Sequence, residues 1–213
     1  MKPAPPVTTA RTRRIVVLVF VTFEGVDGSG KSTQAALLAE HLAASGRDVV
    51  ATREPGGTPL GEKIRGLLLD GEHPAPWAEA ALFAAARAEL AERVIRPSLA
   101  AGADVVCDRY LDSSLAYQGI ARGLGVDRVL ELNVAVADLT PDRTFVLLLD
   151  REAAAARAAA EPDRMEQEDG AFHAAVADGY RELAERYPER IIVLDGSLPE
   201  DTLAARIRED LDV

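Results

Sequence analysis

Cysteine and histidine are scarce in this chain of 213 residues, which contains one cysteine and three histidines. A single cysteine excludes a disulfide within the chain, and Cys107 lies in an apolar run where a core thiol is expected. This usage fits a reducing compartment, so we expect the protein to be cytoplasmic. Internal repeats and a clear domain linker are also lacking, which favours a single domain.

Positive charge is in deficit as well. The chain has 24 Lys and Arg against 35 Asp and Glu, a formal net charge of −11. A surface this acidic repels nucleic acids and anionic membranes, so we expect neither as a partner. A small anionic ligand would have to be bound by locally gathered arginines.

No apolar run is long enough to cross a bilayer. The run at 15–23 is too short, ends in Glu24 and lacks a small-residue cleavage site, so it is not a signal peptide. It predicts a buried strand. We expect a disordered leader at 1–14 and one domain at 15–213.

The strongest motif present is the segment 25–32, which matches G-x-x-x-x-G-K-[ST] at every fixed position. Its glycines allow backbone amides to close around a polyphosphate, and the helix that begins near Lys31 directs its positive end to the same place. Lys31 would reach the outer phosphates, and the Ser32 hydroxyl can ligate magnesium. The predicted nucleotide-binding residues are Gly25, Gly28, Ser29, Gly30, Lys31, Ser32 and Thr33.

Apolar strand patterns alternate with helical patterns along the rest of the chain. This order predicts an α/β protein with a central parallel five-stranded sheet and helices on both faces, the three-layer fold of P-loop NTPases. The expected strands are 15–23, 49–52, 104–107, 145–149 and 191–194. The expected helices are 34–45, 60–69, 77–95 (ended by Pro97), 113–120, 127–136, 151–160, 172–187 and 199–211.

Two features narrow the class of P-loop protein. The only asparagine, Asn133, is followed by valine, so the Asn-Lys-x-Asp element of GTP switches is missing, and no basic track suggests a polymer motor. Arg53 and Arg109 stand at two strand tips, where a second anion would face the P-loop. The alanine-rich stretch followed by a charged break predicts a short lid at about 151–169. These features favour a small-molecule kinase.

Six segments, in the same order, resemble bacterial thymidylate kinase. The most specific are Arg-Glu-Pro-Gly-Gly at 53–57 and Ala-Tyr-Gln-Gly at 116–119. The others are the P-loop, Leu-Phe-Ala-Ala-Ala-Arg at 82–87, Asp-Arg-Tyr at 108–110 and Asp-Arg-Met-Glu-Gln at 163–167. The resemblance implies in-line transfer of the γ-phosphoryl of ATP to dTMP with magnesium, and a homodimer. The acceptor phosphate has a second pKa of about 6, so it is itself the nucleophile, and no histidine base is needed.

The resemblance also implies roles around the phosphates. Arg53 and Arg109 would bind the acceptor phosphate; the alternatives are a surface salt bridge with Glu54 for Arg53 and a purely structural role for Arg109. Asp108 would act with Ser32 on magnesium, unless it only caps the next helix. Asp27 would bind the 3′-hydroxyl of dTMP, with a solvated loop carboxylate as the alternative.

Further roles are implied around the base. Phe83 would stack on thymine, and Arg87, four residues later on the same helix face, would donate to an exocyclic oxygen. Ser114 and Gln118 would lie near the base, and Tyr117 under the sugar, where it would exclude a ribose 2′-hydroxyl. Ordinary packing is the alternative for Phe83 and Tyr117.

The lid departs from the family pattern, because 158–160 are alanines where relatives often carry another basic residue. We expect Arg157 to serve catalysis and Arg164 to serve structure or contact the adenine side. The alternatives are a kinase for another nucleoside monophosphate and a nucleotide-binding regulatory protein that has lost its activity.

Overall fold

A computed structural model describes residues 19–70, 73–157 and 163–213. The predicted leader at 1–14 and the end of the alanine-rich stretch, 158–160, lie outside the described residues.

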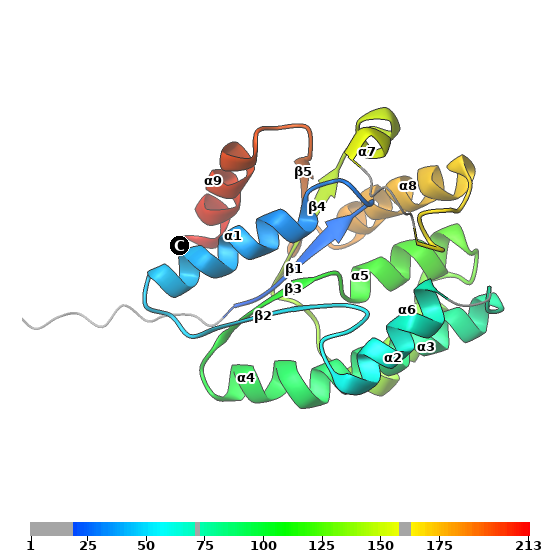
Figure 1. Ribbon diagram of the computed structural model, residues 1–213, viewed down its shortest axis with the longest axis horizontal. Coiled ribbons are helices and arrows are strands. Elements are labelled where there is room, and N and C mark those ends of the chain that lie inside the picture. The colour runs from blue at the N-terminus through cyan, green and yellow to red at the C-terminus, as the bar shows by residue number, and fades with distance from the viewer. Residues whose placement is uncertain (1–18, 71–72, 158–162) are drawn as a thin grey trace, which may run out of the picture.

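The centre of the molecule is a five-stranded sheet in the order β2-β3-β1-β4-β5, in which every pairing is parallel (Figure 1). This confirms the predicted α/β fold. Because β1 and β3 are parallel neighbours, their carboxyl ends lie side by side. The P-loop follows β1 at this edge of the sheet and leads into the first helix. The strands are β1 (Phe20–Gly25), β2 (Val49–Arg53), β3 (Asp104–Asp108), β4 (Arg143–Leu148) and β5 (Ile191–Asp195).

Helices cover both faces of the sheet (Figure 1). They are α1 (Lys31–Ala44), α2 (Pro59–Leu69), α3 (Pro76–Leu90), α4 (Arg96–Ala100), α5 (Leu111–Ser114), α6 (Val126–Ala137), α7 (Arg151–Arg157), α8 (Gly170–Arg186) and α9 (Glu200–Leu211), with π-helical stretches η1 (Ala91–Ile95) and η2 (Leu115–Ala121).

The two faces of β1 belong to different apolar clusters, as the period of two in a strand requires. Val21 and Phe23 pack with residues of α1 and α9. Phe20 packs on the other face with residues of η2 and α8. Glu24 lies on the Phe20 face by the same alternation, so its carboxylate points under the helices that follow β3.

Pro97 does not end the long helix, so the predicted end there is wrong. Helical backbone continues from α3 through η1 into α4, and the Arg96 amide donates to the carbonyl of Ala91, five residues back. Proline lacks an amide hydrogen and its ring clashes with the carbonyl four residues earlier. The wider π turn just before Pro97 relieves that conflict, which lets the helix run on.

A buried polar cluster ties α5 to the sheet. Arg190 donates to both carboxylate oxygens of Asp112 at 2.6 and 2.7 Å, and Asp112 also accepts from Thr144 of β4 at 2.9 Å. Thr144 in turn pairs with Thr22 of β1 at 2.9 Å. Asp112 is fully buried, so its charge needs this set of partners. The cluster fixes where α5 begins, directly behind the pocket described next.

Candidate functional site

The P-loop joins the end of β1 to the start of α1 through glycines that no other residue could replace without strain. Gly28 and Gly30 have φ values of 75° and 95°, in the left-handed region. A Cβ on Gly25 would lie 2.3 Å from the Leu147 carbonyl oxygen. The loop therefore holds its backbone against β4, with the amide end of α1 facing outward.

Lys31 is folded into this loop. It is 5% exposed, and its Nζ donates to the Val26 carbonyl at 2.8 Å and lies 3.5 Å from Asp27. Burial and the charge of Arg109 lower the pKa of Lys31 to about 8, although Asp27 and Asp108 oppose this. An arriving phosphate would remove that penalty, so the lysine is prepared for an anion.

Ser32 and Asp108 meet beside Lys31. The Ser32 hydroxyl donates to Asp108 Oδ2 at 2.5 Å, while Asp108 Oδ1 is buried without a hydrogen-bond partner. An orphaned carboxylate oxygen next to a hydroxyl is the donor set that a hard cation such as Mg²⁺ prefers. Within the described ranges no group of three or more His, Cys, Asp or Glu could hold a metal. The remaining ligands would have to come from phosphates and water.

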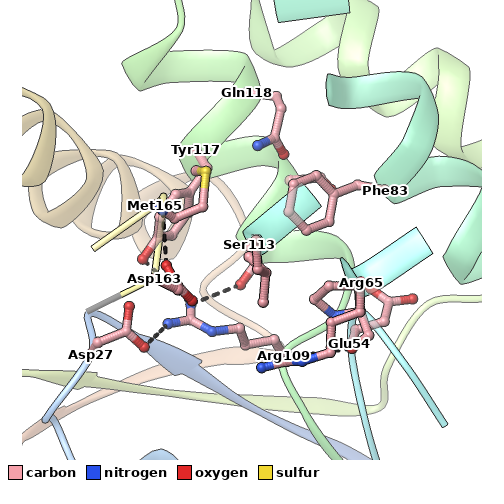
Figure 2. Close-up of a pocket in the computed structure, with 13 residues that line it drawn as sticks. Asp27, Glu54, Arg65, Phe83, Arg109, Ser113, Tyr117, Gln118, Asp163 and Met165 are labelled. Atoms are coloured by element: carbon pink, nitrogen blue, oxygen red, sulfur yellow. Dashed lines mark hydrogen bonds and ion pairs between the residues drawn. The ribbon is translucent and has the colours of Figure 1, made fainter. Parts of the chain in front are cut away.

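A pocket that is open to solvent lies beside the P-loop at the carboxyl ends of β1, β2 and β3 (Figure 2). Its lining residues are Asp27, Glu54, Pro55, Arg65, Leu69, Phe83, Arg109, Ser113, Ser114, Tyr117, Gln118, Asp163 and Met165.

Asp27 and Arg109 join the P-loop to this pocket. Arg109 Nη2 donates to Asp27 Oδ1 at 2.7 Å, and its Nη1 lies 3.3 Å from Ser113 Oγ and 3.4 Å from the Tyr117 hydroxyl (Figure 2). Burial would raise the pKa of Asp27, but the charges of Arg109 and Lys31 outweigh it and hold that pKa well below its usual range. Arg109 itself has φ 66°, a strained value for a side chain that must turn into the site.

Glu24, a residue for which the sequence predicts no role in the site, supports this wall from behind. Its fully buried carboxylate accepts from the Tyr110 amide at 2.8 Å, Ser113 Oγ at 2.5 Å and the Tyr180 hydroxyl at 3.1 Å. Burial, with the nearby Asp112, raises the pKa of Glu24 to about 7. The one signal for this role in the sequence is that an acidic residue follows directly on an apolar strand pattern.

The structure brings most of the predicted residues together. Asp27 and Arg109 line the pocket with the predicted base and sugar residues, which are Phe83, Ser114, Tyr117 and Gln118. Tyr117 is buried, and burial raises its pKa to about 12. Ser114 Oγ is buried without a partner, as expected of a group that awaits a ligand.

Arg87 is not part of the pocket wall, contrary to expectation. It is 1% exposed and donates to Glu54 Oε2 at 2.6 and 2.9 Å, to the Tyr110 carbonyl at 2.9 Å and to Asn133 Oδ1. These bonds occupy nearly all its donors. Arg65 lines the pocket together with Arg109, and it donates to the Pro55 carbonyl at 3.0 Å. The sequence does not predict this place for Arg65, because its spacing in the helix does not distinguish it from the other charged residues of α2.

Arg53 and Arg164 also lie outside the pocket wall. Arg53 is half exposed and pairs with Glu62 at 2.9 Å, not with the neighbouring Glu54. Arg164 is buried and donates to the Leu68 carbonyl at 2.6 Å and to Glu79 at 2.7 Å, which agrees with the structural alternative. Its neighbours Asp163 and Met165 line the pocket instead.

The helix α7 packs over the P-loop. A Cβ on Gly28 would lie 2.7 Å from the Ala154 carbonyl oxygen and 3.3 Å from Arg157 Cβ. The exposed Arg157 donates to the Gly196 carbonyl at 3.1 Å. Its guanidinium is therefore near the phosphate loop and is held by a backbone carbonyl.

Comparison with known proteins agrees with this geometry. The family model "Thymidylate kinase" matches residues 23–207. The thymidylate kinase of Gloeobacter violaceus is 48% identical over 92% of this chain and 95% of its own length, and that of Deinococcus radiodurans is 47% identical over 89% and 94%. The crystal structure of thymidylate kinase from Ehrlichia chaffeensis superposes with a TM-score of 0.77 at 35% identity, covering 92% of this chain and 98% of that one. The family match over residues 23–207, together with near-complete alignment to these enzymes, places this chain in the thymidylate kinase family.

Proposed function

We propose that the P-loop binds ATP, that the adjoining pocket binds dTMP, and that the γ-phosphoryl passes directly between them to give dTDP and ADP. The observation that carries this assignment is the 2.7 Å contact between Asp27 and Arg109, which puts one P-loop residue into the wall of the pocket. Donor and acceptor sites are thereby contiguous, as in-line transfer requires.

The cations around this junction would hold the two sets of phosphates. Lys31 would bind the outer phosphates of ATP, and Arg109 the phosphate of dTMP. Arg53 would join them by leaving Glu62, because an exposed ion pair of this kind contributes only about 0.2–1 kcal/mol. The acceptor dianion is itself the nucleophile, so the protein supplies position and charge, not a base.

The apolar and hydroxyl groups of the pocket would hold the nucleoside. Phe83 would stack on thymine, Ser114 and Gln118 would face its polar edge, and Tyr117 would lie under the sugar. We assign Arg87 an indirect role, because it binds the carboxylate of Glu54, a residue of the pocket wall.

Magnesium fits the pair formed by Ser32 and Asp108, given the unpartnered Asp108 Oδ1. Bound there, the ion would neutralise charge on the phosphates of ATP. Ser32 and Asp108 would hold it between α1 and the end of β3.

Asp27→Ala tests the junction. We expect kcat/KM for dTMP to fall about 10- to 100-fold, the size of a lost hydrogen bond to a charged group, while the Kd for ATP stays nearly the same. ADP formation from ATP, magnesium and dTMP measures the first quantity, and equilibrium titration with ATP the second. Asp178→Ala, an exposed residue of α8, is the control. A selective loss of ATP affinity would overturn the assignment of Asp27.

Asp108→Asn tests the metal assignment. One carboxylate oxygen becomes an amide, so we expect the magnesium concentration for half-maximal rate to rise by about tenfold or more. The rate is titrated with magnesium at saturating ATP and dTMP. Asp178→Asn should keep the wild-type curve. An unchanged magnesium requirement in Asp108→Asn would exclude Asp108 from the site.

Arg157→Ala tests the lid. If Arg157 leaves Gly196 to neutralise charge that develops during transfer, kcat should drop by roughly 100- to 1,000-fold with little change in either KM. Steady-state kinetics with both substrates measure this, and Arg181→Ala, an exposed arginine of α8, is the control. Equal kcat values in Arg157→Ala and wild type would contradict a catalytic role.

We also propose a cytoplasmic homodimer. The buried lone Cys107 supports a reducing compartment, and no helix in the described part of the chain is long and apolar enough to cross a membrane. Leu60 and Leu67, seven residues apart on one face of α2, are 48% and 59% exposed, an apolar surface suited to a second copy.

Leu67→Glu tests this surface. We expect the charge to shift the protein from dimer toward monomer in analytical ultracentrifugation. Val193→Glu places the same charge on an exposed residue of β5 and should leave the dimer intact. A wild-type protein that sediments as a monomer at micromolar concentration would refute the homodimer.

A further inference from the structure

Glu79 is a buried carboxylate behind the pocket with four donors around it. It belongs to α3, is 1% exposed and precedes Phe83 by four residues, so both lie on one side of the helix. Arg164 Nη2 donates to it at 2.7 Å, Arg122 at 3.1 and 3.2 Å, and Gln118 Nε2 at 3.0 Å. Three segments that are distant in sequence therefore meet at one side chain.

The contact with Gln118 has a consequence for the orientation of its amide. An ionised carboxylate only accepts hydrogen bonds, so the group of Gln118 that faces it must be the NH₂. Burial would raise the pKa of Glu79, but the hydrogen bonds from Arg122, Gln118 and Arg164 outweigh it and lower that pKa, which keeps the carboxylate ionised. The Gln118 oxygen must then face the other way.

That other direction is the pocket. Gln118 lines it, and Figure 2 shows the amide next to Phe83 with the oxygen on the side of the aromatic ring. Gln118 is itself only 1% exposed, so it has little room to exchange partners with water. Glu79 is not among the lining residues and would not touch a ligand.

The direction of this amide matters for pyrimidine recognition. Thymine presents a ring N–H between two carbonyl groups, whereas cytosine presents an unprotonated ring nitrogen at the same position. The Gln118 oxygen can accept from the ring N–H of thymine, but it would face the unprotonated ring nitrogen of cytosine, which is also an acceptor. A flipped amide would reverse that preference. A buried polar mismatch of this kind discriminates between ligands much more strongly than a change in apolar contact.

We propose that Glu79 is a positioning residue that locks the Gln118 amide with its oxygen toward the base, and so makes the pocket select thymine over cytosine. This inference rests on the proposed assignment of the pocket to the base of dTMP. It adds a residue whose effect on the base passes through Gln118.

Glu79→Gln is the direct test. A glutamine can donate as well as accept, so it no longer dictates the direction of the Gln118 amide. We expect the ratio of kcat/KM for dTMP to that for dCMP to fall by about tenfold or more, mainly through KM for dTMP. Glu79→Asp keeps an acceptor-only group and should retain the ratio even where stability falls.

A double-mutant cycle separates this role from the structural bonds to Arg122 and Arg164. Gln118→Met removes the amide, so adding Glu79→Gln to it should leave the dTMP to dCMP ratio unchanged within about twofold. If Glu79→Gln lowers both kcat/KM values equally in either background, its role is structural and the inference is overturned.

Two further controls keep the outcome decisive. The first is unfolding in denaturant, measured for each variant. The second is the double variant Glu79→Gln with Arg122→Gln, which removes one positive charge along with the negative charge of Glu79; it is used if Glu79→Gln alone does not fold. If Gln118→Met leaves the ratio unchanged, the pocket is not the base site, and the proposed assignment fails with the inference. If Gln118→Met lowers the ratio and Glu79→Gln does not, only the inference fails.

Discussion

The site depends on one carboxylate placed between two cations. Asp27 contacts Arg109 at 2.7 Å and lies 3.5 Å from Lys31; Lys31 is buried, whereas Asp27 and Arg109 are partly buried. Without it, a lysine and an arginine would face each other across a poorly solvated gap before any phosphate arrives. Burial, and after it the charge of Arg109, still lower the pKa of Lys31. A kinase must hold several positive charges close together before its substrates bind. Here the carboxylate of Asp27, a residue of the P-loop itself, reduces the repulsion between them.

Sequence patterns predicted the fold well because the relevant constraints are local. Glycines at fixed spacing, apolar runs and alternating periods determine the strand and helix order, and the observed elements follow it. The errors arise where tertiary packing decides. Pro97 is a strong local stop signal, yet the helix continues because a π turn precedes it.

The site was predictable where a motif constrains the backbone and less so where partners are chosen in three dimensions. Asp27, Phe83 and Gln118 line the pocket as expected. Arg53 also lies at the tip of a strand, as expected, but its guanidinium pairs with Glu62 in the first turn of α2. Arg87 shares a helix with Phe83 at the right spacing, yet it binds Glu54 in the interior. Residue type and spacing indicate which direction a side chain starts in, not which buried carboxylate will bind it.

The acidic composition has a second explanation in these buried carboxylates. Glu24, Glu54 and Glu79 are each less than 5% exposed, and each binds a group that forms or supports one wall of the pocket. Glu24 binds Ser113, Glu54 binds Arg87, and Glu79 binds Gln118. Buried carboxyl groups behind a site restrict the hydroxyl, guanidinium and amide groups in front of them to fewer orientations. The many acidic residues therefore do more than repel polyanions, because three of them order the polar groups around the pocket.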